Sequence, residues 1–310
     1  MNRVIVTGAT GMIGASLIEQ LINDNIEVTA IVRPNSAKLV NLVRSTKVTV
    51  VECDVNNLLS LSDKLKGKYD VFYHFAWDGT YGNSRDDMFL QERNIRNTLE
   101  AVTLAHNLNC DVFVGAGSQA EFGFVDGVIS DKLPKNPITG YGIAKYTAGK
   151  LSAILCSQYG MRQSWGRIVS TYGPRDNSYT MVMSGIINML DGQRMKFTKG
   201  EQVWDYLYGE DCARAFYLIG KYGKDGKAYT IGSGKTRLLR EYIEVIRDIV
   251  NPDLDIGIGE IPYYPNQVMR LEADISELSS DTGFTPQIEF EEGIRRTVDW
   301  YKKINNKEQM

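Results

Sequence analysis

The chain has 310 residues, of which 43% are hydrophobic and 24% charged, and its formal net charge is −3. This length and apolar content allow a large core, in one large domain or two modest ones. Because no segment concentrates Lys and Arg, we expect no binding to nucleic acid. The longest apolar runs are only strand-length, so no membrane span is expected either.

The cysteine and histidine content bears on compartment and metal binding. The four cysteines share no Cys-x-x-Cys spacing and are predicted to be reduced, buried thiols; they are Cys53, Cys110, Cys156 and Cys212. A first strand starting by Val4 leaves no room for a signal peptide, so we expect a cytoplasmic protein. His74 and His106 are the only histidines, and neither stands among Cys, Asp or Glu at ligand spacing. No metal site is therefore expected.

The opening segment predicts a nucleotide site. A β-branched apolar stretch leads into a glycine turn and then into a helix with apolar residues four apart. Backbone N–H groups at the N-terminus of such a helix suit a pyrophosphate. Gly8 would permit the sharp turn, Gly11 the approach of phosphate, and Gly14 the packing of helix on strand. The cofactor-binding residues expected from this turn are Gly8, Thr10, Gly11, Met12, Ile13 and Gly14.

Strand-like segments then alternate with helix-like ones, which predicts a parallel sheet with helices on both faces. The predicted strands are Glu27–Val32, Lys47–Cys53, Tyr69–Ala76, Asp111–Gly117 and Gln163–Ser170. The fold class is therefore α/β, a Rossmann-type doubly wound parallel sheet. Such sheets bind ligands beyond the carboxyl ends of their strands.

Residues at these strand ends indicate the cofactor. Arg33, together with Ser36, favours the 2′-phosphate of NADP over the free ribose of NAD, although a solvated arginine is the alternative. Ala76 would let the backbone approach the cofactor, while His74 is interpreted as a packed core histidine. Further cofactor contacts are expected from Asp54 and Val55, which would border the adenine, and from Phe75 and Trp77.

Ser118 ends the strand that follows a long predicted helix, Asp86 to His106. It is not a hydrolase nucleophile, because a nucleophile elbow needs glycine two residues before and after the serine. Ala116 and Ala120 occupy those positions.

Tyr141 opens the next predicted helix, which runs to about Tyr159, and Lys145 lies one turn further on the same face. A nearby ammonium favours the phenolate, which would lower the pKa of the tyrosine toward neutrality. The same Tyr-x-x-x-Lys spacing also occurs at Tyr146 and Tyr217. Tyr141 is preferred because it opens the helix that follows Ser118. Tyr146 lies about 140° round the same helix, so the two phenols cannot both face one site, and Tyr217 lies in a late segment with no partner motif.

Together these motifs resemble the cofactor loop and catalytic triad of an extended short-chain dehydrogenase/reductase, in the nucleotide-sugar epimerase/dehydratase family. Ser118, Tyr141 and Lys145 match the triad, and Tyr141 and Lys145 would also contact the cofactor. The resemblance continues over nearly the whole chain, through residues 167–174, 204–211, 229–234, 273–276, 284–286 and a final amphipathic helix from about Glu291 to Lys302.

The resemblance implies an NAD(P)-binding Rossmann domain over residues 1–170, joined by a returning segment at about 205–235. Residues 171–310 would mainly form a smaller α/β nucleotide-sugar domain. It also implies a homodimer, in which the helices near 86–106 and 141–159 pair into a four-helix bundle.

The chain departs from the family pattern at several positions. Gln119 and Ala120 replace the acidic pair that dehydratases carry, and neither transfers a proton, so dehydration is not expected. Ser170 stands where relatives have asparagine, and Trp204 where many have arginine. Substrate contacts are expected from Asp78, Thr80, Glu121, Phe122, Ser170, Arg194, Trp204, Arg237 and Arg270; the arginines are candidates for the pyrophosphate, or else solvated surface residues.

The resemblance therefore implies an NADP(H)-dependent reductase acting at C4 of a nucleotide-linked 4-keto-6-deoxyhexose, with Tyr141 as proton donor. An NAD-dependent nucleotide-sugar 4-epimerase would use the same three residues. A non-catalytic dinucleotide-sensing protein on the same fold is the third alternative.

Overall fold

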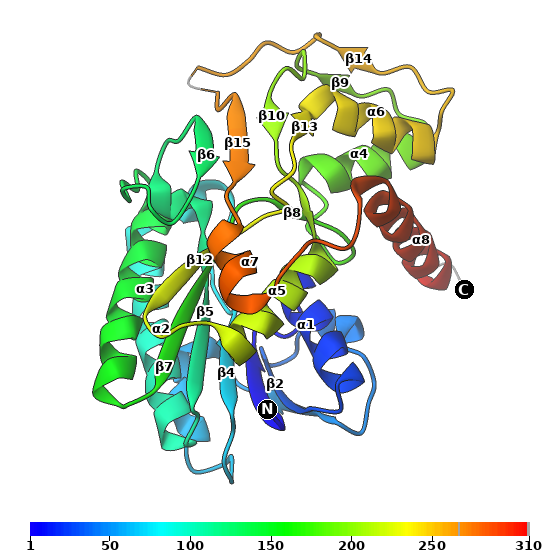
Figure 1. Ribbon diagram of the computed structural model, residues 1–310. Helices are drawn as coiled ribbons and strands as arrows, with labels where there is room; N and C mark the ends of the chain where they lie inside the picture. The colour runs from blue at the N-terminus through cyan, green and yellow to red at the C-terminus, as the bar shows by residue number, and fades with distance from the viewer. Residues whose placement is uncertain (266, 309–310) are drawn as a thin grey trace.

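A computed structural model describes residues 1–265 and 267–308 of the chain. A parallel seven-stranded sheet forms its centre, with the strand order β3-β2-β1-β4-β5-β7-β12 (Figure 1). The strands are β1 (Arg3–Thr7), β2 (Glu27–Val32), β3 (Val48–Glu52), β4 (Val71–His74), β5 (Val112–Ser118), β7 (Arg162–Ile168) and β12 (Lys227–Ile231). The order reverses between β1 and β4, and a doubly wound sheet binds its ligand at that crevice.

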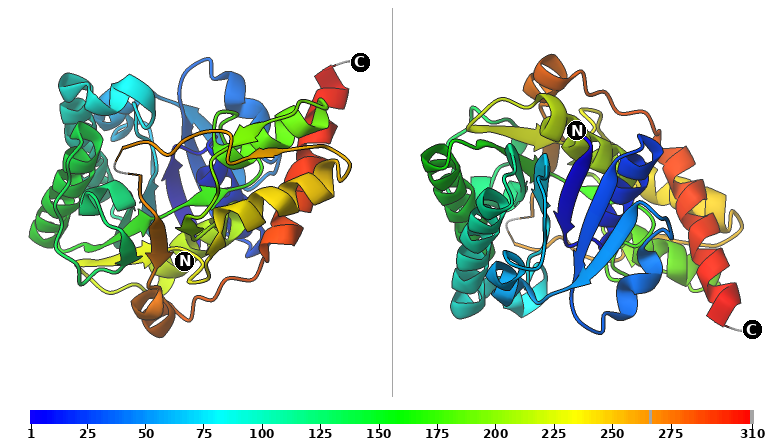
Figure 2. Two further views of the ribbon diagram at one scale, coloured as in Figure 1. Left: turned by 90° about the horizontal axis from the view of Figure 1, so that it is seen from above. Right: turned by 90° about the horizontal axis from the view of Figure 1, so that it is seen from below.

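Helices cover both faces of this sheet, as the three views of Figures 1 and 2 show. On one face α1 (Met12–Asn23) packs beside α5 (Gly209–Tyr222), and α7 (Ser276–Thr282) lies against α5. On the other face α2 (Met88–Asn107) packs beside α3 (Gly140–Gln158). Successive strand residues point to opposite faces, so Val4 and Val6 join the core under α1 while Ile5 joins the core under α2.

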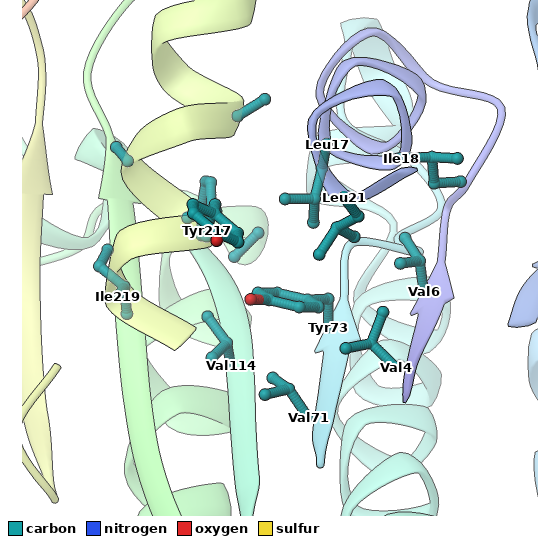
Figure 3. Close-up of a cluster of buried hydrophobic side chains, with 14 of the residues drawn as sticks. Val4, Val6, Leu17, Ile18, Leu21, Val71, Tyr73, Val114, Tyr217 and Ile219 are labelled. Atoms are coloured by element: carbon teal, nitrogen blue, oxygen red, sulfur yellow. The ribbon is translucent and has the colours of Figure 1, made fainter. Parts of the chain in front are cut away.

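The turn between β1 and α1 depends on close backbone packing. Gly8 has φ +64°, and a Cβ there would lie 2.7 Å from the backbone carbonyl carbon of Phe75 at the end of β4. Beneath the same turn, a Cβ at Gly14 would lie 2.3 Å from the Gly8 oxygen. Leu17 and Leu21 then project from α1 toward Tyr73 of β4 (Figure 3). The glycines thus let α1 lie close against the sheet.

A smaller set of elements stands above the carboxyl ends of the strands (Figure 1). Its helices α4 (Met181–Leu190), α6 (Leu239–Val250) and α8 (Phe290–Glu308) enclose a separate hydrophobic core. Its short strands are β6 (Gly127–Ile129), β8 (Thr171–Tyr172), β9 (Lys196–Phe197), β10 (Val203–Trp204), β11 (Leu207–Tyr208), β13 (Arg237–Leu238), β14 (Gly257–Ile258) and β15 (Arg270–Ala273). The described residues also include the short 3₁₀ helices η1 (Ala37–Asn41), η2 (Val55–Leu61), η3 (Gly82–Asp86) and η4 (Gln119–Phe122).

The predicted α/β class and parallel sheet are confirmed, and the five predicted strands agree with β2, β3, β4, β5 and β7 to within two residues at each end. The segment at 205–235 supplies α5 and the edge strand β12 of the main sheet. Leu278 and Phe284 also pack into the core under α1 and α5. Part of residues 171–310, the predicted substrate domain, therefore packs with the seven-stranded sheet.

All four cysteines are buried and free of disulfides. Among residues 1–265 and 267–308, no helix has the length and apolar character that a membrane crossing requires. The same residues hold no group of three or more His, Cys, Asp or Glu side chains suited to a metal ion.

Candidate functional site

A cavity of about 370 Å³ opens at the crevice between β1 and β4. The glycine turn forms its floor through Thr7, Gly8, Ala9, Thr10 and Gly11. The ends of the neighbouring strands add Ile31, Val32, Arg33, Cys53, Phe75, Ala76, Trp77 and Asp78 to the lining. This is the size and position expected for a nucleotide at the switch point of a doubly wound sheet.

The glycine turn fits a dinucleotide phosphate. Gly11 is the N-cap of α1 and brings no side-chain acceptor to the first N–H groups of the helix. A Cβ at Gly11 would meet only the Gly8 oxygen, at 3.4 Å, so the approach to these N–H groups is open. Asn41 holds the turn from η1, because its side-chain amide donates to the Thr10 carbonyl at 2.9 Å. These features suit the binding of an anion at the turn.

Two cationic side chains and a hydroxyl lie at the η1 end of the cavity. Arg33, Ser36 and Lys38 all line it. The Arg33 guanidinium donates to the Asp78 carboxylate at 2.6 Å, and 68% of the Arg33 side chain is exposed. An exposed ion pair of this kind contributes only about 0–1 kcal/mol, so Asp78 does not lock Arg33 away from an anionic ligand.

Trp77 connects the cavity to the triad residues. Trp77 lines the cavity, and its indole N–H donates to the Gln91 side chain at 3.0 Å. The Lys145 ammonium nitrogen lies 3.7 Å from the centre of the same indole, and the Tyr141 ring meets the indole edge-on at 6.1 Å. Tyr141 and Lys145 therefore lie next to Trp77, which is one of the residues that line the cavity.

The structure brings Ser118 and Tyr141 together. Ser118 ends β5, and its hydroxyl oxygen accepts the Ala120 N–H at 3.2 Å, which leaves the hydroxyl proton free to donate. Burial raises the pKa of Tyr141, while a hydrogen bond with the Ser118 side chain opposes that rise. The lowered pKa expected from the sequence is not found, because the desolvation of a phenol that is only 8% exposed outweighs the favourable contacts.

Lys145 is buried and donates to the Ala116 carbonyl at 2.8 Å. Burial lowers the pKa of Lys145 to about 7, and the Glu121 carboxylate opposes this effect. At neutral pH, this ammonium is therefore close to the point where it loses its proton.

Glu121 organises the interior behind the triad. One carboxylate oxygen accepts both the Ser118 N–H and the Trp165 indole N–H, each at 2.9 Å, and the other accepts from Arg167 Nε at 2.6 Å. Arg167 also pairs with Asp131. Glu121 was expected to border the sugar; its side chain is instead fully buried with both oxygens occupied by protein donors. Phe122, predicted beside it, is likewise buried in the core under β6 and β15.

Other predicted residues have structural contacts where they lie. Asp54 caps η2 by accepting the Asn56 N–H at 2.9 Å. The Met12 side chain packs against Gly209, where a Cβ would lie 3.1 Å from it. The three candidate pyrophosphate arginines each pair with carboxylates away from the cavity lining: Arg194 with Asp255 and Glu260, Arg237 with Glu291, and Arg270 with Glu272. Ser170 and Trp204, the two departures from the family pattern, hydrogen bond to each other at 3.2 Å.

Some of the remaining predicted residues line the cavity, and the others pack in the core beneath it. Val55 and Thr80 line the cavity with Arg33, Ser36 and Asp78. Ile13 and Gly14 lie in α1, where Ile13 packs against the core. His74 is a packed core histidine, because its Nδ1 lies 2.9 Å from the Thr7 hydroxyl and burial lowers its pKa to about 3.

Several cavity residues were missed by sequence reasoning. Lys38 stands in η1, and Asn177 and Tyr179 come from the segment before α4. Tyr179 stacks on Tyr81 with ring centres 3.8 Å apart, which joins the smaller part of the molecule to the loop after β4. Of these three residues, only Lys38 could have been found from the sequence, because it lies two residues after Ser36.

Comparisons with known proteins agree with this fold. The model of the NAD dependent epimerase/dehydratase family matches residues 4–232. The chain therefore belongs to this family of extended short-chain dehydrogenases/reductases, and it is an enzyme of that type.

Among its relatives, a putative UDP-glucose 4-epimerase of Methanocaldococcus jannaschii is 26% identical, over 97% of this chain and 99% of the relative. A dTDP-glucose 4,6-dehydratase of Haemophilus influenzae is 25% identical, over 97% and 98%. In structure, a UDP-N-acetylglucosamine 4-epimerase of Methanobrevibacter ruminantium matches with a TM-score of 0.87 at 23% identity, over 98% of this chain and 99% of that one. A dTDP-glucose 4,6-dehydratase of Streptomyces venezuelae with NAD bound matches at 0.85 and 23%, over 98% of both.

The Glu121 network yields a stability prediction. Glu121→Gln leaves Arg167 with only Asp131 and removes a buried charge partner, so we expect a loss of about 3 kcal/mol in the free energy of unfolding. Urea unfolding at pH 7 measures it. The matched control is Glu92→Gln, which breaks an exposed pair with Arg96 and should cost less than about 0.5 kcal/mol. Equal losses in the two variants would contradict the importance of the buried pair.

Proposed function

We propose that the protein is an NADP(H)-dependent reductase of a nucleotide-linked 4-keto-6-deoxyhexose. The observation that supports the cofactor is the placement of Arg33, Ser36 and Lys38 at one end of the cavity formed by the glycine turn. Their positive charge and hydroxyl suit the extra phosphate of NADP. The family and the relatives that bind NAD support the dinucleotide itself.

Within this proposal the residues of the chain divide the work. The N-terminus of α1 and the glycine turn hold the pyrophosphate, and the Trp77 end of the cavity leads to the reacting carbonyl. When bound, NADPH supplies the hydride that reduces the C4 carbonyl. Ser118 donates a hydrogen bond to the carbonyl oxygen, Tyr141 gives that oxygen its proton, and Lys145 binds the nicotinamide ribose.

The electrostatics of Tyr141 are compatible with a proton donor. Because burial raises the pKa of Tyr141, the phenol keeps its proton at neutral pH, as a proton donor must. Removal of a proton from a sugar hydroxyl would instead need a phenolate. Gln119 and Ala120 follow Ser118 directly and carry no acid or base for dehydration.

A 4-epimerase is the second candidate, because relatives that match nearly the whole chain carry that name. It would use the same three residues but retain NAD through the catalytic cycle. A non-catalytic dinucleotide sensor is a third candidate, and it predicts that a Tyr141→Phe variant keeps its biological role.

Cofactor analysis and activity assays separate these candidates. We expect no retained NAD by mass spectrometry of the purified protein, and consumption of NADPH with a panel of nucleotide-linked 4-keto-6-deoxyhexoses. Tyr141→Phe should lower kcat by about 10²–10⁴-fold, because it removes the proton donor. Tyr146→Phe is the matched control on the same helix and should keep activity. Turnover with NADH alone, or retained NAD with interconversion of 4-epimers, would contradict the reductase.

Arg33 provides a separate test of the cofactor. Arg33→Ala should weaken NADPH binding about 10–100-fold, as expected for losing a hydrogen bond to a charged group, and leave NADH binding unchanged. Asp78→Asn, which frees the Arg33 guanidinium, should keep NADPH affinity. Calorimetric titration of both cofactors measures these changes. Equal losses for NADPH and NADH in Arg33→Ala would show that Arg33 does not read the 2′-phosphate.

The proposal includes a homodimer in which α2 and α3 pair with their copies. These neighbouring helices expose Phe89, Ile143, Leu151 and Ile154, and the α3 residues recur at a helical spacing along one face. Ile154→Glu should convert a dimer into a monomer of 34.8 kDa in light scattering. Val40→Glu, at an exposed apolar side chain of η1, is the control and should remain dimeric. A monomeric wild-type protein would contradict this part of the proposal.

A further inference from the structure

The 3₁₀ helix η3 is held against the start of α3, next to Tyr141. The Asp86 carboxylate accepts the Gly140 N–H at 2.7 Å. A Cβ at Gly140 would lie 3.0 Å from the Arg85 carbonyl oxygen, so glycine permits this close approach. From the other side, the Gln91 side-chain amide donates to the carbonyls of Gly79 and Ser84, each at 2.9 Å. The backbone around Arg85 is therefore held by contacts with both α2 and α3.

This anchoring places the Arg85 side chain on Tyr141. The guanidinium carbon lies 4.5 Å from the centre of the Tyr141 ring. Arg85 donates one hydrogen bond, to the Thr80 carbonyl at 3.3 Å, and no ion pair between Arg85 and a carboxylate is found within residues 1–265 and 267–308. Its charge is therefore directed at the phenol rather than neutralised by an acidic neighbour.

Lys145 is placed differently. Its ammonium lies 5.8 Å from the Tyr141 ring but 3.7 Å from the Trp77 ring, and it donates to the Ala116 carbonyl. A guanidinium remains protonated throughout the range in which a buried lysine loses its charge. Of the two cations, Arg85 lies nearer to the Tyr141 ring, and it keeps its positive charge over a wider range of pH.

We propose that Arg85 is a positioning residue of the proton-transfer site, whose guanidinium stabilises the tyrosinate that remains after Tyr141 has given its proton to the product oxygen. This inference rests on the proposed role of Tyr141 as proton donor. The cation over the ring interacts more strongly with the anionic phenolate than with the neutral phenol, so it lowers the energy of the charged state that proton transfer creates.

Several segments of the chain face Tyr141. Burial and Glu121 of η4 raise the pKa of Tyr141, whereas the hydrogen bond with Ser118 of β5 and the charge of Arg85 of η3 lower it. Trp77, after β4, meets the ring edge-on, and Lys145 lies one turn along α3. Since burial raises the phenol pKa, the stabilisation by Arg85 keeps proton donation from becoming too costly.

The direct test is a titration of residue 141 that needs no substrate. 3,5-Difluorotyrosine at position 141, whose lower intrinsic pKa brings ionisation into an accessible range, is followed by ¹⁹F NMR in the full chain. Arg85→Met should raise the pKa of this residue by about one unit, a tenfold loss in its ionisation constant. Arg85→Lys should recover part of the shift. Arg96→Met, an exposed arginine of α2 paired with Glu92, should leave the titration unchanged.

Kinetics complete the test in the unlabelled enzyme. With Tyr141 as donor, the rate of NADPH-dependent reduction falls at high pH as the phenol ionises. Arg85→Met should move this alkaline limb to higher pH and lower kcat about tenfold, with KM for NADPH unchanged. An Arg85→Met titration identical to wild type would overturn the inference, whatever the activity. A shifted titration in a protein that does not reduce 4-keto sugars would instead overturn the proposed function and leave the electrostatic contact intact.

Discussion

The buried pair of Glu121 and Arg167 is the interaction on which the candidate site depends. Glu121 accepts the Ser118 N–H at the end of β5, so the backbone that presents the Ser118 hydroxyl to Tyr141 is tied to a charge pair in the interior. The same carboxylate opposes the fall in the Lys145 pKa caused by burial. One anion thus positions the serine and helps to keep the lysine protonated. Without its arginine, a carboxylate with no exposed surface would carry a large desolvation cost.

The fold was largely predictable because its signals are local. β-branched stretches of strand length, the three-residue spacing of Gly8, Gly11 and Gly14, and the apolar period of α1 each reflect backbone geometry within a few residues. Gly8 has the positive φ that its turn requires, and Gly14 lies directly beneath the Gly8 oxygen. The contact of Tyr141 with Ser118 joins segments 23 positions apart in sequence, and the resemblance to a family supplied that link.

The remaining site residues could not be predicted, because their surroundings are tertiary. Arg85 stands in a polar segment with no motif, and its place over Tyr141 depends on a contact between Asp86 and Gly140. Tyr179 reaches the cavity from beyond the main sheet. Conversely, the sequence suggests Arg194 as a pyrophosphate ligand. In the structure Arg194 pairs instead with Asp255 and Glu260, which lie 61 and 66 positions further along the chain. Residue type suggests a chemistry, but the pairing partner decides whether the side chain is free to perform it.

The central proposal is that the chain moves a hydride from NADPH to C4 of a sugar while its own phenol supplies the proton. The most direct measurement uses NADPH with deuterium at both C4 positions of the nicotinamide ring and a nucleotide-linked 4-keto-6-deoxyhexose, and locates the label in the product by NMR and mass spectrometry. We predict one deuteron per product molecule, bonded to the sugar C4. A product that forms without deuterium, or 4-epimers that interconvert with no NADPH consumed, would contradict it.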